Sequence, residues 1–109
     1  MSATLCGQLA EWPSKSAMAK ILRNAGLRVR VGNYSIRVED CSHFVIQEYG
    51  GDLGNPQIDA DADSVEEMTK DGSLVSKALT AAGIKHSFEI YDQADVLAGY
   101  LHHDWPSKE

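Results

Sequence analysis

Acidic side chains occupy every second position in the segment Asp59-Ala-Asp61-Ala-Asp63. Carboxylates at this spacing open the calcium loop of EF-hand proteins, which also needs a glycine at its sixth position and a bidentate glutamate at its twelfth. Counted from Asp59, these positions hold Ser64 and Lys70, and a lysine places a cation where the strongest ligand belongs. The pattern therefore favours a strand edge or loop kept soluble by charge, or a surface that docks on a basic protein.

Histidines are the second group of residues that could carry chemistry. His102 and His103 are adjacent near the end of the sequence. We predict a helix there, on which adjacent side chains point about 100° apart and cannot easily share one ion. His43 and His86 fall on separate predicted strands and could join His102 only through tertiary contacts. We therefore predict no metal site, and keep a polar pocket around His43, His86 and His102 as an alternative.

Arginines dominate a predicted hairpin. Arg28, Arg30 and Arg37 alternate with apolar residues and should share the outer face of the sheet. Such a face can bind phosphate or carboxylate groups, and it could line the same alternative pocket as the histidines. The competing interpretation, which we favour, is a solvated face whose arginines pair weakly with Glu39 and Glu48.

Known catalytic motifs are missing from the sequence. It has no Gly-x-Ser-x-Gly nucleophile elbow and no paired-cysteine zinc spacing. The glycines at Gly50-Gly51-Asp52-Leu53-Gly54 lack the Lys-Ser/Thr pair of a phosphate-binding loop. We therefore predict no catalytic residues and no cofactor, and favour a binding protein over an enzyme.

Charge is distributed unevenly along the 109 residues, whose net charge is −6. Up to Gly51 the sequence has six Lys/Arg and four Asp/Glu, whereas from Asp52 onward it has four Lys/Arg and twelve Asp/Glu. Nucleic-acid binding depends on counterion release by basic residues, so the acidic half should repel nucleic acid. The same half should attract basic protein surfaces.

The sequence has no segment suited to a membrane. No apolar run is long enough to cross a bilayer, and Met1–Trp12 has neither the basic start nor the apolar stretch of a signal peptide. We therefore expect a cytoplasmic protein without membrane association. In that compartment Cys6 and Cys41 should remain reduced.

Periodicity in the first half predicts a helix followed by three strands. Strand-like alternation covers Leu27–Val31 and Ser35–Glu39, which a turn at Gly32-Asn33 would join into a hairpin. His43–Tyr49 is a third strand, so the three should form an antiparallel meander. Before them, a helix that ends at Gly26 is predicted from apolar residues at helical spacing: Met18, Ile21, Leu22 and Ala25.

The second half is predicted to be mostly helical. Gly50–Asp63 is a loop in which Gln57–Ala62 could form a short edge strand. Ser64 and Glu67 have the spacing of a capping box and start a short helix. A second helix restarts at Asp71-Gly72-Ser73.

A strand and a last helix are expected to complete the chain. Lys85–Tyr91 alternates like a strand, with Phe88 and Ile90 on one side. Asp92 can cap a helix that Pro106 stops and that carries Val96, Leu97, Tyr100 and Leu101.

An internal echo links two parts of the sequence. Ser16–Val31 and Ser73–Phe88 share the pattern Ser-x-x-x-Lys-x-Leu-x-x-Ala-Gly followed by Leu or Ile. Gene duplication would explain it. We favour the simpler interpretation that two helix-to-strand joints obey the same capping rules.

The fold class predicted from these elements is α+β. We expect a two-layer sandwich in which helices cover one face of an antiparallel sheet of about four strands, in the order α-β-β-β-α-β-α. Residues 1–109 should form a single domain with residues 1–12 and 106–109 at its periphery. A first strand at Thr4–Leu9, giving a ferredoxin-like arrangement, is a minor option because that segment alternates poorly.

The function favoured by charge and size is protein binding. We expect a small acidic module, such as an inhibitor or immunity-type protein, that masks a basic site on a partner protein. The alternative is a small enzyme or ligand-binding domain with the His/Arg-lined pocket, and a homo-oligomer is a third option. The partner-binding residues would be acids with two aromatic anchors: Asp52, Asp59, Asp61, Asp63, Glu66, Glu67, Tyr49 and Trp105.

Overall fold

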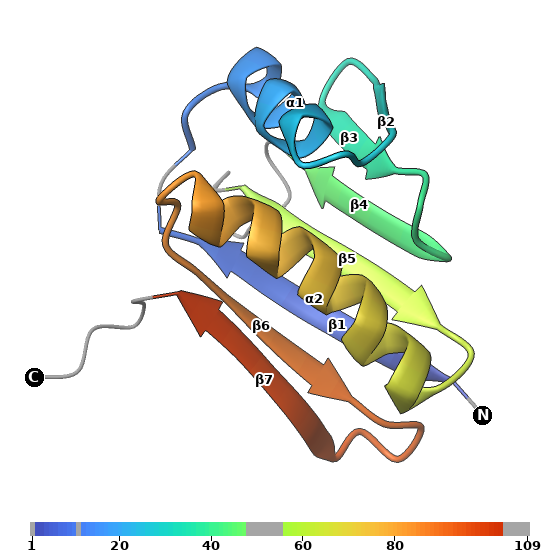
Figure 1. Cartoon of the computed structure of the whole chain (residues 1–109). Coiled ribbons are helices and arrows are strands. Elements are labelled where there is room, and N and C mark those ends of the chain that lie inside the picture. Colours follow the sequence, from blue (N-terminus) through green and yellow to red (C-terminus); the bar gives the residue numbers. More distant parts are fainter. Residues whose placement is uncertain (1, 11, 48–55, 104–109) are drawn as a thin grey trace, which may run out of the picture.

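A computed structural model describes residues 2–10, 12–47 and 56–103 of the chain (Figure 1). These residues form two helices, α1 (Lys15–Asn24) and α2 (Val65–Ala81). The strands are β1 (Ala3–Leu9), β2 (Val29–Val31), β3 (Ser35–Val38), β4 (His43–Gln47), β5 (Gln57–Ala62), β6 (His86–Tyr91) and β7 (Leu97–His103).

All seven strands belong to one antiparallel sheet in the order β2-β3-β4-β5-β1-β6-β7. Both helices lie on the same face of this sheet (Figure 1). Side chains on that face alternate with outward-facing ones along each inner strand, as the period of a half-buried strand requires. The core therefore lies between one sheet face and the helices, and its largest fully buried side chains include Leu5, Phe44, Ile58, Phe88, Met18, Leu22, Met68 and Leu79.

Both helices end in the same backbone motif. Gly26 and Gly83 have positive φ angles of 87° and 74°. The following amides, of Leu27 and Ile84, donate to carbonyls of the last helical turn at 3.1 and 2.9 Å, which is the Schellman pattern. The strands that follow occupy different places, β2 at an edge and β6 beside the central β1. The two repeated segments therefore share the same helix-capping geometry, although the strands that follow them differ in their place in the sheet.

The predicted fold class is wrong in the number and order of its elements. The described residues form seven strands rather than about four, and two helices rather than three or four. The antiparallel pairing and the placement of the helices on one face of the sheet are confirmed. The structure also confirms the predicted elements that correspond to α1, β2, β3, β4 and β6.

The last predicted helix is instead the edge strand β7. Asp92 does accept hydrogen bonds through its carboxylate, from the amides of Ala94 at 2.8 Å and Val96 at 3.0 Å. These bonds close a tight turn, in which Asp95 has a φ of 61°, and connect β6 to β7. A helix cap and such a turn use the same local hydrogen bonds, so the sequence signal could not separate them.

Two segments that the sequence placed outside the sheet centre lie inside it. Residues 1–12, predicted to be peripheral, include β1, which pairs with β5 on one side and β6 on the other. The strand at Thr4–Leu9, predicted as a minor option, is therefore confirmed. Gln57–Ala62 is the inner strand β5 rather than an edge strand or loop.

A single helix replaces the two predicted between Ser64 and Gly83. α2 continues through Gly72, where a Cβ atom would lie 2.9 Å from Cδ1 of Leu5. The missing side chain thus lets the helix pack closely on β1. One residue earlier, the buried carboxylate of Asp71 accepts the amide of Ser42 at 3.1 Å, which fastens the β3–β4 turn to the helix. No helix in the described part of the chain is long and apolar enough to span a membrane.

Candidate functional site: the open sheet face

The side of the sheet opposite the helices, here called the open face, carries the outward-facing residues of the strands. Strand register aligns these residues in rows that run across the sheet. The central row, from β2 to β7, is Arg30, Arg37, Val45, Asp59, Cys6, Glu89 and Tyr100. Charged groups of both signs therefore share one face but sit at different distances from the β2 edge.

Acidic residues gather in the middle of the open face. Asp59 and Asp61 project from β5, while Ala60 and Ala62 of the same strand are buried under the helices. The Asp-Ala repeat is thus the polar-apolar alternation of a strand. Asp59 lies opposite Cys6 of β1, so on this face a carboxylate from β5 stands beside a thiol.

Glu89 extends this acidic centre from the other side of β1. It lies opposite Cys6 in the β1–β6 register, so Cys6 stands between Asp59 and Glu89. Neutral donors hold both carboxylates: Gln57 donates to Asp59 and the Tyr91 hydroxyl donates to Glu89, each at 3.1 Å. Such bonds orient the two charges without neutralising them.

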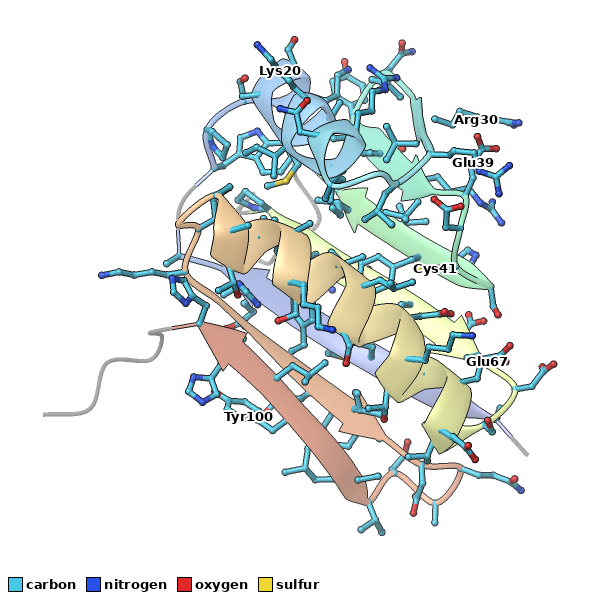
Figure 2. All side chains as sticks on the ribbon, viewed as in Figure 1. Lys20, Arg30, Glu39, Cys41, Glu67 and Tyr100 are labelled. Carbon is cyan, nitrogen blue, oxygen red and sulfur yellow. The ribbon has the colours of Figure 1, made fainter. Side chains whose placement is uncertain are left out.

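The other predicted acids lie at the β5–α2 junction. Ser64 Oγ accepts the Glu67 amide at 3.1 Å, and the Glu67 carboxylate accepts the Asp63 amide at 3.2 Å. Figure 2 shows Glu67 beside this junction, where its carboxylate serves the start of the helix. Asp63 and Glu66 are exposed there. The remaining predicted partner residues, Asp52, Tyr49 and Trp105, lie outside the described residues.

The arginines occupy the β2–β3 end of the molecule. Arg28 pairs with Asp40 at 3.0 Å, and Arg30 pairs with Glu39 at 3.2 Å, as the favoured interpretation of the arginine face predicted for Arg30. Figure 2 shows Arg30 and Glu39 close together beside β2 and β3. Hydrogen bonds from Arg28 hold the pKa of the Asp40 carboxyl below its usual range. Both of these ion pairs, which are found among the described residues, lie at the β2–β3 end of the molecule. Neither of them includes Asp59 or Glu89.

The three histidines of the alternative pocket do not come together. His43 lies on β4 opposite Asp61, and His102 lies on the edge strand β7, with three strands between β4 and β7. His86 is fully buried beneath the helices. Its Nε2 accepts the hydroxyl of Ser76 at 2.7 Å while Nδ1 donates to the Ile84 carbonyl at 2.9 Å.

The Ser76–His86 hydrogen bond has the form of a nucleophile and its base. Ser76 is only 8% exposed and His86 is fully buried, so the hydroxyl does not face a surface that a substrate could reach. The pair therefore satisfies two polar side chains inside the core. Sequence reasoning named His86 but missed Ser76, which lies ten residues earlier on another element.

Both cysteines are free, and their environments differ. Burial, followed by the charges of Asp71 and Asp40, raises the pKa of the half-buried Cys41 to about 12. Cys6 is exposed on the open face, and its pKa is also raised, by partial burial and by the carboxylates of Asp59 and Glu89. No group of three or more possible metal ligands occurs among the described residues.

Cys6 makes the negative potential of the open face measurable. We expect the Asp59→Asn variant to react with iodoacetamide at Cys6 about two- to fivefold faster near neutral pH, because losing the carboxylate lowers the thiol pKa and raises the thiolate fraction. Peptide mapping by mass spectrometry follows Cys6 separately from the slow Cys41. An Asp95→Asn control, in the β6–β7 turn, should leave the rate unchanged. Equal rates in wild type and Asp59→Asn would show that the potential at Cys6 has another origin.

The open face brings together residues that are far apart in sequence, from β5, β1 and β6. Comparison of the chain with protein-family models, with curated proteins and with solved structures gives no significant match. Of the predicted partner-binding acids, the structure places Asp59 and Asp61 on the open face and Asp63, Glu66 and Glu67 at the start of α2. Glu89 and Cys6 were missed, although the predicted alternation of Phe88 and Ile90 already placed Glu89 on the opposite side of its strand.

Proposed function

We propose that this protein is a binding module that presents the acidic centre of its open face to a basic surface of a partner protein. The observation that carries the proposal is the convergence of Asp59, Asp61 and Glu89 on neighbouring positions around β1. An inhibitor or immunity-type protein that masks a basic site needs such a concentration of negative charge. The chain's net charge of −6 acts in the same direction at longer range.

The sheet gives this surface its rigidity. Asp59 projects from an inner strand that is hydrogen-bonded on both sides, and the alternate residues of that strand are buried. Preorganised charges lose little conformational freedom when a partner binds, so more of their interaction energy appears as affinity. Tyr100, at the β7 end of the same row, is 43% exposed and supplies an aromatic anchor beside the charges.

Basic residues elsewhere on the open face would orient the partner. Arg30 and Arg37 end the central row on the β2 side, so a basic surface is repelled there and attracted toward β5, β1 and β6. We place this encounter in the cytoplasm, where free thiols such as Cys6 and Cys41 persist.

The test compares two variants that remove the same charge from different places. Asp59→Asn with Asp61→Asn neutralises the open face, whereas Glu66→Gln with Asp95→Asn neutralises the helix start and the β6–β7 turn. Proteins captured from an extract of the source organism are purified, and their association with each variant is followed by surface plasmon resonance at low and high salt. We expect the open-face variant to lower the association rate constant by about tenfold at low salt and the control to leave it nearly unchanged.

Two results would contradict the proposal. Association that does not slow as salt rises would remove the electrostatic basis. A loss of binding in the Glu66/Asp95 control, with none in the Asp59/Asp61 variant, would move the binding site to the start of α2 or to the β6–β7 turn.

A further inference from the structure

The strand β7 forms one edge of the sheet and differs from edges that are protected against pairing. It spans the seven residues Leu97–His103 and, within the described residues, pairs only with β6. None of its residues is Asp, Glu, Lys or Arg. Edge strands usually carry such charges, because an open row of backbone N–H and C=O groups recruits other strands.

The opposite edge shows the protection that β7 lacks. β2 is only three residues long and has Arg30 at its centre. Two copies paired through β2 about Arg30 would place the two guanidinium groups opposite each other, which is unfavourable. Self-pairing about Arg30 is therefore disfavoured at the β2 edge, whereas the β7 edge carries no such charge.

Exposed apolar side chains occur at both edges of the sheet, and three of them lie on β7 or directly before it. Val96 is 58% exposed, Leu97 53% and Tyr100 43%. They are half of the large hydrophobic residues exposed in the described part of the chain; the others are Val31, Tyr34 and Leu74. Apolar groups clustered along an unprotected strand mark a surface that gains from being covered.

We propose that β7 pairs with β7 of a second copy of this chain, in antiparallel orientation, to form one continuous sheet. The register irregularity between Ile90 and Tyr91 lies near the start of β7, and Gly99–His103 continues as a regular ladder. A twofold axis through Tyr100 or Leu101 places only apolar, aromatic and histidine side chains of this stretch opposite one another. The self-pairing is thus free of the like-charge contact that β2 would create.

This arrangement has a consequence for the open face. A twofold axis perpendicular to the sheet keeps both open faces on the same side, so the dimer displays two acidic centres in one surface. Dimer formation itself needs neither the acidic centre nor a partner protein. A failure of one proposal is therefore distinguishable from a failure of the other.

Paired charge variants test the interface in either register. Tyr100→Lys with His102→Lys adds positive charge on the outward side of β7, and Tyr100→Glu with His102→Glu adds negative charge there. We expect wild type to dimerise with rising concentration in analytical ultracentrifugation, and each variant alone to raise the dimer dissociation constant by about 100-fold or more. Mixing the two variants should restore a dimer, because opposite charges then face each other.

A matched control separates edge pairing from stacking of two open faces. Thr4→Lys with Gln8→Lys adds the same charge to exposed positions of the central strand β1, and this variant should still dimerise. Hydrogen exchange on the unmodified protein provides a measurement that needs no variant, since β7 amides should become protected as concentration rises. A wild type that stays monomeric, a mixture that forms no heterodimer, or a dimer broken only by the β1 control would overturn the proposal.

Discussion

The Gly7→Ala variant is expected to unfold with a free energy about 1–3 kcal/mol lower than wild type, and Gly7→Val by more. Gly7 lies in the middle of β1, between Ile58 of β5 and Phe88 of β6. A Cβ atom there would lie 2.8 Å from Cβ of Ile58 and 2.9 Å from Cδ1 of Phe88. Both neighbours are fully buried, so neither can move away without disturbing the core. Total stabilities of about 5–15 kcal/mol make this a large loss.

Urea denaturation followed by circular dichroism measures the effect. Gly99→Ala is the matched control, because Gly99 is also a strand glycine but its nearest neighbour, Cδ1 of Ile90, would be 3.4 Å from the new Cβ. That distance is ordinary contact, and the added methyl group reduces unfolded-state freedom, so the control should be neutral or slightly stabilising. If Gly7→Ala were as stable as Gly99→Ala, close packing would not explain the glycine in β1.

Patterns within short stretches of the sequence predict individual helices and strands correctly. They fail for strands whose place depends on pairing with residues far away in the sequence. The first helix and the hairpin of β2 and β3 follow from apolar spacing and turn residues within a few positions. The sequence of β1 gives a weak strand signal, because Gly7 occupies a buried position and Cys6 an exposed one, which reverses the usual contrast between the two faces. The central place of β1 is fixed by β5 and β6, whose paired residues lie at least 49 positions away in sequence.

The candidate site was predictable in the same partial way. Asp59 and Asp61 alternate with alanines. Once this segment is assigned to a strand, the alternation predicts that both carboxylates lie on the same face of the sheet. Glu89 lies beside Cys6 because of the register between β6 and β1. No pattern in the nearby sequence predicts that register. The histidine pocket failed to assemble for a related reason, since His86 points to the helical face and His43 and His102 to the open one.

The stability of the protein is expected to fall below about pH 6.5 because of the buried His86. Burial lowers the pKa of this imidazole, His103 and His102 lower it further, and the Ile84 carbonyl opposes the shift in part. At higher pH the ring is neutral in both folded and unfolded chains, and its full contribution to stability is present. As the pH falls below the pKa of His86 in the unfolded chain, the unfolded chain binds a proton that the folded chain does not. The free energy of unfolding therefore decreases until the pH reaches the lower pKa of His86 in the folded chain.

Replacement of His86 tests this assignment and the hydrogen bonds around the ring. His86→Leu should remove a slope of at most about 1.4 kcal/mol per pH unit from urea-denaturation free energies between about pH 5 and 7. Near pH 8 it should cost about 2–4 kcal/mol, because the Ser76 hydroxyl and the Ile84 carbonyl lose their partner in the core. Adding Ser76→Ala should recover part of that loss, since the second change removes one of the two unsatisfied groups. The exposed His102→Gln variant should keep most of the slope, and a full slope in His86→Leu would assign the pH dependence to other groups.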